Sequence, residues 1–269
     1  MDTLTRIGGL AGEDLESLAR ARQVLEHPAL AVRIADLAGM PIEALLARLP
    51  AGARAPIRAG TRRAIGASLD AALRTLGGGH RPSSDWLHRG AVIVTGAVGG
   101  ATGLPGLLLE LPVSLTLMLR SIGDNARAQG EDLSRVASRL ECLTVFAYGS
   151  RPSRDDGAEP AYFAIRAALA RAVAEAAEFV AERGVTEALG ERSAPAMVRL
   201  VARVANRFGV AVTDKAAAQI VPLIGAVGGA AINTLFVTHF QDTARAHFTV
   251  RRLERTYGVE RVRRAYDQA

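Results

Sequence analysis

Two long runs of uncharged residues limit how this chain can fold more than any other feature. Gly90–Leu109 contains 20 residues without a charge, and Ala216–Gln241 contains 26 residues without a formal charge. A helix of about 20 apolar residues is long enough to cross a bilayer, but the buried helix of a soluble domain can be equally apolar. The runs therefore predict either two central helices of a soluble bundle or segments that insert into a membrane, and the sequence leaves both open.

The two runs share a glycine pattern. Gly-Ala-Val-Gly-Gly-Ala occurs at 96–101 and again at 225–230. Glycines four residues apart lie on one face of a helix, where the missing side chains allow a second helix to approach closely. Prolines within or beside the runs, at Pro105, Pro112 and Pro222, predict broken helices or hairpins. We expect close helix packing at these glycines: Gly96, Gly99, Gly100, Gly103, Gly225, Gly228 and Gly229.

Outside the runs, apolar residues recur with the period of a helix, as in 131–146, 159–183 and 194–208. With 49% hydrophobic residues, the chain can bury a large core. The sequence predicts an all-α fold, a multi-helix bundle with the two Gly-rich apolar helices or hairpins at its centre. Loop-like residues at 77–84 place a boundary near residue 80. We therefore expect an N-terminal helical extension over 1–79 and a helical domain over 80–269.

The formal net charge of +6 is concentrated in two arginine clusters. Residues 54–89 sum to +5 and residues 242–269 sum to +3, so the clusters flank the apolar runs on their outer sides. Basic residues beside apolar segments are typical of contact with an anionic membrane surface. No helix-turn-helix, zinc-finger or RNP pattern accompanies the charge, so we expect no nucleic-acid partner. The arginines expected to contact anionic lipid or a membrane partner are Arg251, Arg252, Arg255, Arg261, Arg263 and Arg264.

A few polar residues in and beside the runs are the candidates for catalysis. His239 and Asp242 are three residues apart and share a helix face. If the two Gly-rich segments pack together, Glu110 and Arg120 would join them in a polar pocket suited to a hydrolase. His239 and His247 are separated by about 12 Å of helical rise, too far to share a metal on one straight helix. We expect no metal and no cofactor.

The N-terminus and the one cysteine indicate the compartment. Met1–Leu10 contains no continuous apolar segment, so we expect no secretory signal and a cytoplasmic location. Cys142 lies within an apolar stretch, where a reduced thiol behaves as a small hydrophobic side chain.

Several short motifs after residue 80 occur together. They include Gly99-Gly100-x-x-Gly103-Leu104-Pro105-Gly106, Glu110-Leu111-Pro112, Gln219-x-x-Pro222 and His247-Phe248-x-x-Arg251-Arg252-Leu253-Glu254. On these residues, over about 80–268, the chain resembles the bacterial EcsC protein family. The resemblance implies an α-helical, membrane-linked bacterial protein. Because the family is named after a gene beside those of an ABC transporter, it also implies such a transporter as a possible partner. It supplies no reaction and no catalytic residue.

Three functional hypotheses follow. The first is a non-catalytic accessory protein at the inner face of the cytoplasmic membrane, which contacts anionic lipid or a membrane protein. The second is a hydrolase that uses Glu110, Arg120, His239 and Asp242. The third is a soluble helical protein that binds a lipid or another apolar ligand between the Gly-rich helices.

Overall fold

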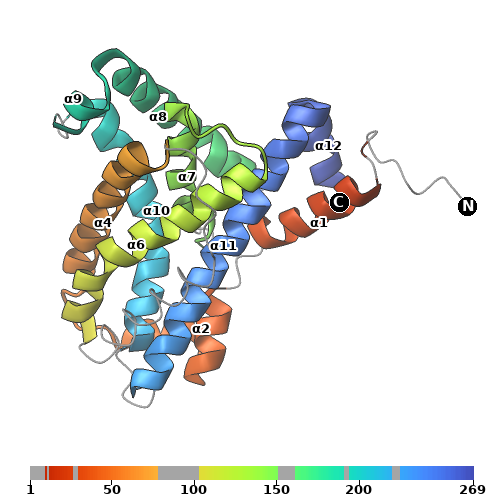
Figure 1. The fold of residues 1–269 in the computed structure, drawn as a ribbon. Coiled ribbons are helices and arrows are strands. Elements are labelled where there is room, and N and C mark those ends of the chain that lie inside the picture. The colour runs from red at the N-terminus through yellow and green to blue at the C-terminus, as the bar shows by residue number, and fades with distance from the viewer. Residues whose placement is uncertain are drawn as a thin grey trace, which may run out of the picture.

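The computed structural model is an all-α bundle, as predicted. It describes residues 10, 12–26, 30–77, 103–150, 161–190, 194–219 and 225–269, and within these residues it contains eleven helices and no strand. Figure 1 shows their arrangement. The helices are α1 (Gly12–Glu26), α2 (Leu30–Ala38), α3 (Ile42–Ala47), α4 (Arg54–Thr75), α6 (Gly103–Ala128), α7 (Val136–Tyr148), α8 (Ala161–Arg183), α9 (Val185–Gly190), α10 (Pro195–Gln219), α11 (Gly225–Tyr257) and α12 (Val259–Gln268).

Helix α11 runs through the bundle and organises it. Its 33 residues span about 50 Å at 1.5 Å per residue, and it packs against α1, α2, α6, α7 and α12. Phe236 and Phe240 lie one turn apart on it, with ring centroids 5.1 Å from each other. Gly258 ends the helix with a φ of +88°, a left-handed conformation that favours glycine, and its N–H donates to the carbonyl of Glu254.

Helix α6 is continuous where the prolines predicted a break. It extends from Gly103 to Ala128 with Pro112 inside it, so the predicted interruption at Pro112 is wrong. Pro105 lies in the first turn, where a backbone N–H has no intrahelical acceptor. Pro112 removes one hydrogen bond, but burial against α4 and α11 on the opposite face compensates for that loss. In the second run, α10 ends at Gln219 and α11 begins at Gly225.

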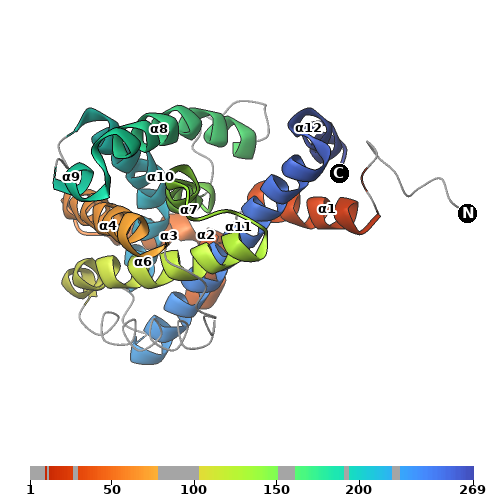
Figure 2. The ribbon, with the colours of Figure 1, turned by 45° about the horizontal axis from the view of Figure 1, so that its top comes forward.

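The described residues share one contiguous apolar core, which includes the N-terminal helices. Leu18 of α1 and Ile57 of α4 belong to the same core as Phe208 and Tyr266. Helix α4 packs against α6, α7 and α10, and α1 packs against α11. Figures 1 and 2 both show α4 beside α6. The division at residue 80 stays a prediction, but the helices before that position contribute to the core of the helices after it.

One end of the bundle, here called the glycine-run end, lies where α6 begins at Gly103 and α11 begins at Gly225. It is the lower end in Figure 1, with α2, the first half of α4 and the last turns of α10. Helices α4 and α6 approach each other closely there. A Cβ added to Gly60 of α4 would lie 2.6 Å from Leu108 Cδ2 of α6, which is closer than van der Waals contact. Gly60 was not among the expected packing glycines. Of those, Gly96, Gly99 and Gly100 lie outside the described residues, and Gly103, Gly225, Gly228 and Gly229 lie in the first turns of α6 and α11.

Among the described residues, one helix is long and apolar enough to cross a membrane. It comprises Leu104–Ala128, and 56% of its most apolar window is buried inside the bundle. A core helix of a soluble protein has the same properties, so this helix is weak evidence for a membrane span.

Candidate functional site

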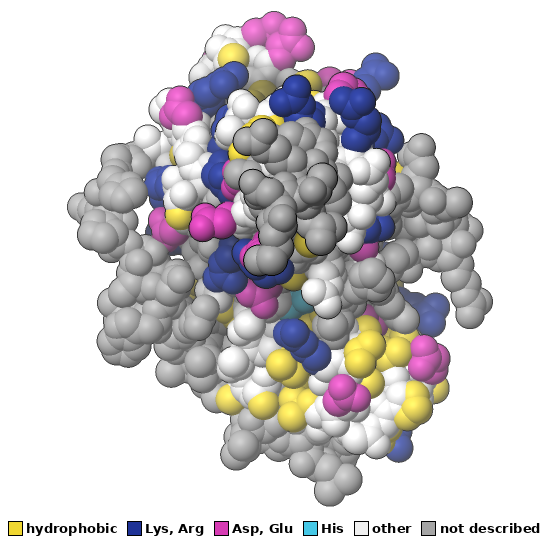
Figure 3. All heavy atoms as spheres, turned by 90° about the vertical axis from the view of Figure 1, so that its right-hand side faces the viewer, with side chains coloured by type: hydrophobic (Ala, Val, Ile, Leu, Met, Phe, Trp, Pro, Cys, Tyr) yellow, Lys and Arg dark blue, Asp and Glu magenta, His cyan; other side chains and the backbone are white. Residues whose placement is uncertain are grey.

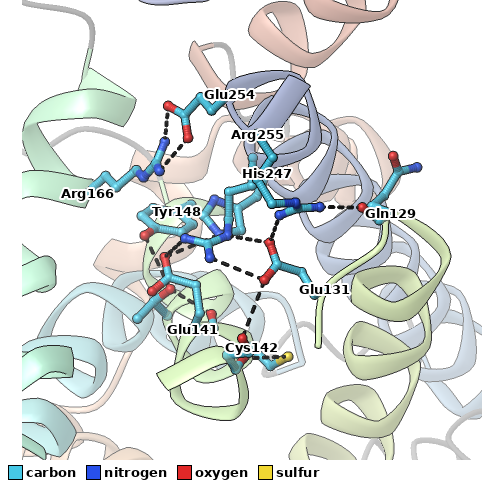
Figure 4. A network of polar contacts seen from close by, with 12 residues as sticks. Gln129, Glu131, Glu141, Cys142, Tyr148, Arg166, His247, Glu254 and Arg255 are labelled. Carbon is cyan, nitrogen blue, oxygen red and sulfur yellow. Dashed lines mark hydrogen bonds and ion pairs between the residues drawn. The ribbon is translucent and has the colours of Figure 1, made fainter. Parts of the chain in front are cut away.

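The most extensive polar cluster lies between α7, α8, α11 and the loop after α6, and it extends from the interior to the surface at Arg255. We call Glu131, Glu141, Arg166, His247, Arg251, Glu254 and Arg255 the buried ionic network (Figure 4). Glu131 accepts from Arg251 Nε at 2.7 Å and from Arg251 Nη2 at 3.2 Å, and it also accepts from Arg255. Burial alone would raise the pKa of Glu131, but the hydrogen bonds and charges of the two arginines outweigh burial and lower it.

His247 links the network to Tyr162 of α8. Its Nδ1 lies 2.9 Å from the Tyr162 hydroxyl, and its Nε2 lies 3.4 Å from Glu141 Oε1. Burial lowers the pKa of His247 although Glu141 opposes the shift, so the imidazole is neutral near pH 7. Because burial raises the pKa of Tyr162, its hydroxyl stays protonated and donates to Nδ1. This assignment places the imidazole proton on Nε2, facing the carboxylate of Glu141.

A bidentate ion pair completes the network. Arg166 donates from both terminal nitrogens to the carboxylate of Glu254, at 2.7 and 2.6 Å. His247 and Tyr162 are fully buried, so a substrate would not reach them without rearrangement of the helices. The network therefore acts first as a structural link between α8, α11 and the loop after α6, because every charge in it is compensated inside the fold.

Three arginines predicted to contact lipid have partners inside the protein. Arg251 and Arg255 belong to the buried ionic network, and Arg252 donates to Asp14 Oδ1 at 2.9 Å and to Gln129 Oε1 at 3.0 Å. The other three predicted contacts lie on α12. Arg261, Arg263 and Arg264 are exposed there, and Arg263 lies 5.7 Å from the centre of the Phe163 ring.

The four residues of the hydrolase hypothesis have separate environments. Glu110 Oε1 lies 3.6 Å from Lys215 Nζ. His239 Nε2 bonds to the Gly149 carbonyl at 2.6 Å, Asp242 accepts from Arg245 at 2.9 Å, and Arg120 is exposed. Among the described residues, no hydrogen bond or ion pair joins any two of the four, and no group of three or more His, Cys, Asp or Glu side chains is arranged to hold a metal ion. Cys142 is buried, as predicted.

Lys215 forms a second buried polar group, at the glycine-run end. Its side chain is 1% exposed, and its Nζ donates to Asn233 Oδ1 at 2.8 Å and lies 5.0 Å from the centre of the Phe236 ring. Burial lowers the pKa of Lys215, and the nearby Glu110 opposes that shift. Lys215 on α10 thus connects Glu110 of α6 with Asn233 of α11. Sequence reasoning missed Lys215 as a site residue, although a lone lysine in an arginine-rich chain, directly before the second apolar run, was a signal.

A groove on the surface runs along α4, α10 and α3, also toward the glycine-run end. Its volume is about 1220 Å³. Four exposed arginines of α4 line one side, and α10 lines the other with mainly small or apolar residues, together with Asn206 and Asp214. Unlike the arginines of α11, these four have no hydrogen-bond or ion-pair partner in the part of the chain that the structure describes. We call this feature the arginine groove, and its lining includes Arg54, Arg58, Arg62, Arg63, Leu46, Ala205, Gly209, Val210, Thr213 and Asp214.

Acidification is expected to destabilise the fold in two steps. The pKa values of His239 and His247 lie below the ordinary 6.5, chiefly because of burial, so the unfolded chain takes up protons first as the pH falls below 6.5. The pKa values of Glu131 and Glu141 lie below the ordinary 4.5, so a second loss of stability begins as the pH falls through 4.5. Thermal denaturation between about pH 7.5 and pH 3.5 measures both steps. An unchanged midpoint between pH 7.5 and 5.5 would contradict the first step.

Comparison with known proteins gives one match. A family model described as the EcsC protein family matches residues 28–253. No curated protein and no solved structure matches the chain. The match begins well before residue 80, so it includes α2, α3 and α4 and the arginines of the arginine groove. Because the matched range covers most of the 269 residues, the chain belongs to the EcsC protein family.

Proposed function

We propose that this chain is a non-catalytic membrane-associated protein that contacts an anionic bilayer with its glycine-run end. The supporting observation is the position of its exposed large apolar side chains. Among the described residues these are Val32, Leu37, Leu109, Val113, Val198 and Val259. The first four lie on α2 and on the first half of α6, which are at the glycine-run end in Figure 1.

The exposed residues of α6 form a stripe. Leu109 is 80% exposed and Val113 is 52% exposed, and a spacing of four residues places them on one helix face together with exposed Pro105. Arg120 is exposed seven residues after Val113, on the same face. An apolar stripe that ends in an arginine suits a helix at the boundary between acyl chains and headgroups, where the arginine extends to the phosphates.

The distribution of charge supports the same orientation. In Figure 3, hydrophobic side chains gather in the lower part, at the height of α2, whereas charged side chains crowd the upper part. The arginines of the arginine groove lie on the first half of α4, which is also at the glycine-run end in Figure 1, and they line a groove with α10 and α3. Apolar and basic groups together at one end favour an anionic membrane surface over a zwitterionic one.

Other features of the proposal come from the family resemblance. We propose the inner face of the cytoplasmic membrane as the location, where anionic lipid is available in a bacterium. A membrane protein such as an ABC transporter would be reached from the same end of the bundle. The hydrolase alternative lacks support from the geometry, because Glu110, His239 and Asp242 each have a separate partner and Arg120 faces solvent.

Sedimentation with lipid vesicles tests the proposal. The purified chain is expected to sediment with phosphatidylglycerol vesicles at low salt and to remain in solution with phosphatidylcholine vesicles. The double substitution Leu109→Glu/Val113→Glu is expected to weaken binding about tenfold or more, because each large apolar side chain removed from water contributes about 1.5–3 kcal/mol when fully buried. The matched control is Val198→Glu/Val259→Glu, which adds the same charge on α10 and α12.

The control variant is expected to bind as the unchanged chain does. Equal loss in both double variants would indicate a simple effect of net charge and would contradict contact through α6. Absence of binding to anionic vesicles at low salt would contradict the proposal as a whole. If Leu109→Glu/Val113→Glu changed only the oligomeric state, the stripe would be the interface with a second copy of the chain, which would also overturn the proposal.

A further inference from the structure

The arginine groove has two walls of opposite chemistry. The α4 wall carries Arg54, Arg58 and Arg62, which are spaced by four residues and are all exposed, with Arg63 beside them. The α10 wall consists mainly of small or apolar residues, with some polar ones, and α3 contributes Leu46; the α10 residues are Ala205, Asn206, Gly209, Val210, Thr213 and Asp214. A groove with guanidinium groups on one side and mainly small or apolar groups on the other fits an amphiphile with an anionic head.

Within the residues that the structure describes, the groove carries an excess of positive charge. The lining contains four arginines and one acidic residue, Asp214, which is buried. Like charges four residues apart on a helix repel each other, and no acidic side chain among the described residues pairs with these arginines. The arginines of α11 are different, because Arg251 and Arg252 bond to Glu131 and Asp14. An anion in the groove would relieve the repulsion between the α4 arginines.

The chemistry of the arginines selects the anion. A guanidinium donates two parallel hydrogen bonds to the oxygens of a phosphate, and clusters of arginine are typical of phosphate recognition. A volume of about 1220 Å³ exceeds the roughly 300–1,000 Å³ of most small-ligand pockets, so a free phosphate would fill only a small part of it. A phosphate joined to a glycerol and the upper part of its acyl chains would use both walls.

The α10 wall is open at Gly209. A Cβ added to Gly209 would meet no atom within 4 Å, and the residue has an ordinary helical backbone. The space over Gly209 therefore belongs to the groove, and a larger side chain at this position would occupy that space without displacing a neighbour. The position provides a way to fill the groove while every arginine remains.

We propose that the arginine groove binds one anionic glycerophospholipid, with its phosphate on the α4 arginines and its glycerol and upper acyl chains along α10. This inference rests on the proposed membrane association and specifies it. The bundle would hold an individual lipid at the glycine-run end, in addition to the contact of α6 with the bilayer.

The test uses lipids that do not form a bilayer. Dihexanoyl phosphatidylglycerol below its critical micelle concentration is titrated into the full chain by calorimetry, and glycerol 3-phosphate and dihexanoyl phosphatidylcholine are titrated separately. We expect the anionic short-chain lipid to bind at one site, at least tenfold more tightly than either comparison ligand. Equal affinity for glycerol 3-phosphate would show that the groove recognises the phosphate group without the acyl chains, and it would overturn the assignment to a lipid.

Two variants locate the binding. Arg58→Ala/Arg62→Ala removes two charges of the groove and is expected to weaken binding at least tenfold. Gly209→Leu fills the groove and is expected to weaken binding to a similar degree while the arginines remain. The control Arg261→Ala/Arg264→Ala removes the same charge from exposed positions on α12 and is expected to bind within twofold of the unchanged chain. The thermal midpoints of all three variants show that they fold.

The outcomes separate this inference from the proposed function. If the chain binds anionic vesicles through α6 but no short-chain lipid, or if both groove variants bind the lipid normally, then the groove inference is wrong and the membrane proposal stands. If the short-chain lipid binds in the groove but vesicles do not bind, then the membrane proposal fails and the protein is a soluble lipid binder. Binding of an acidic peptide in place of all three small ligands would overturn the groove inference.

Discussion

Replacing Glu131 with alanine is expected to lower the free energy of unfolding by about 3–5 kcal/mol, the usual cost of removing one member of a buried ion pair. Glu131 accepts from Arg251 and Arg255 together, and its side chain is almost fully buried. Without it, Arg251 and Arg255, one turn apart on α11, lose their shared acceptor. Among the described residues, Arg251 keeps one carboxylate nearby, that of Glu141 at 3.7 Å.

A matched substitution at the surface supplies the control. Glu16 forms an exposed ion pair with Arg20 at 3.5 Å on α1, and Glu16→Ala is expected to cost less than about 0.5 kcal/mol, because exposed pairs contribute little. Urea denaturation of both variants measures the difference from the shift in midpoint at constant slope. A loss below about 1 kcal/mol for Glu131→Ala would mean that the contacts of Glu131 with Arg251 and Arg255 are hydrated. The buried ionic network would then not hold α11 in place.

The fold class followed from the sequence because helices leave a local signature. The period of 3.6 residues over 159–183 predicted a helix, and α8 spans Ala161–Arg183, with an ion pair between Arg171 and Glu175 at 2.9 Å on its surface. The effect of proline was less predictable. Pro112 stays inside α6, because packing against α4 and α11 outweighs the loss of one local hydrogen bond. The rule that proline breaks a helix considers only the local backbone and leaves out the free energy of packing against other helices.

The roles of the arginines were not predictable from the same signals. The net charge of residues 242–269 follows from the sequence, but the partners of its arginines do not. Arg251 and Arg252 bond to Glu131 and Asp14, which lie 120 and 238 residues away in the chain. Which charges are compensated is decided by these long-range contacts, and no local pattern encodes them. The same reasoning applies to Arg58 and Arg62, which the sequence placed in the first basic cluster without any indication that they line a groove.

Close packing at glycines also occurs away from any sequence pattern. The spacing of the glycines in the two runs predicts close packing there, and this stays a prediction, whereas the structure adds tight contacts at isolated glycines. A Cβ at Gly123 would lie 2.8 Å from Leu76 Cδ2, and a Cβ at Gly149 would lie 2.6 Å from Phe240 Cε1. A single glycine gives no pattern, so only the structure identifies these two positions.

Replacing Lys215 with methionine is expected to lower the free energy of unfolding by about 3–5 kcal/mol, because it leaves the buried carboxylate of Glu110 without its ion-pair partner. Ser114 would remain as its hydrogen-bond donor at 2.9 Å. Glu110→Gln is expected to cost less. Lys215 would keep Asn233 as an acceptor and Phe236 as an aromatic neighbour, and burial already lowers its pKa, so the amine can lose its proton.

The double variant Glu110→Gln/Lys215→Met decides whether the two residues act as a pair. If they do, the double variant is expected to be more stable than Lys215→Met alone, with a coupling free energy of about 1–3 kcal/mol in urea denaturation, because neither charge remains buried without a partner. Additive losses would mean that each side chain acts independently. Since the pair joins α6, α10 and α11 at the glycine-run end, a strong coupling would also explain how α6 is fixed while its apolar stripe stays exposed.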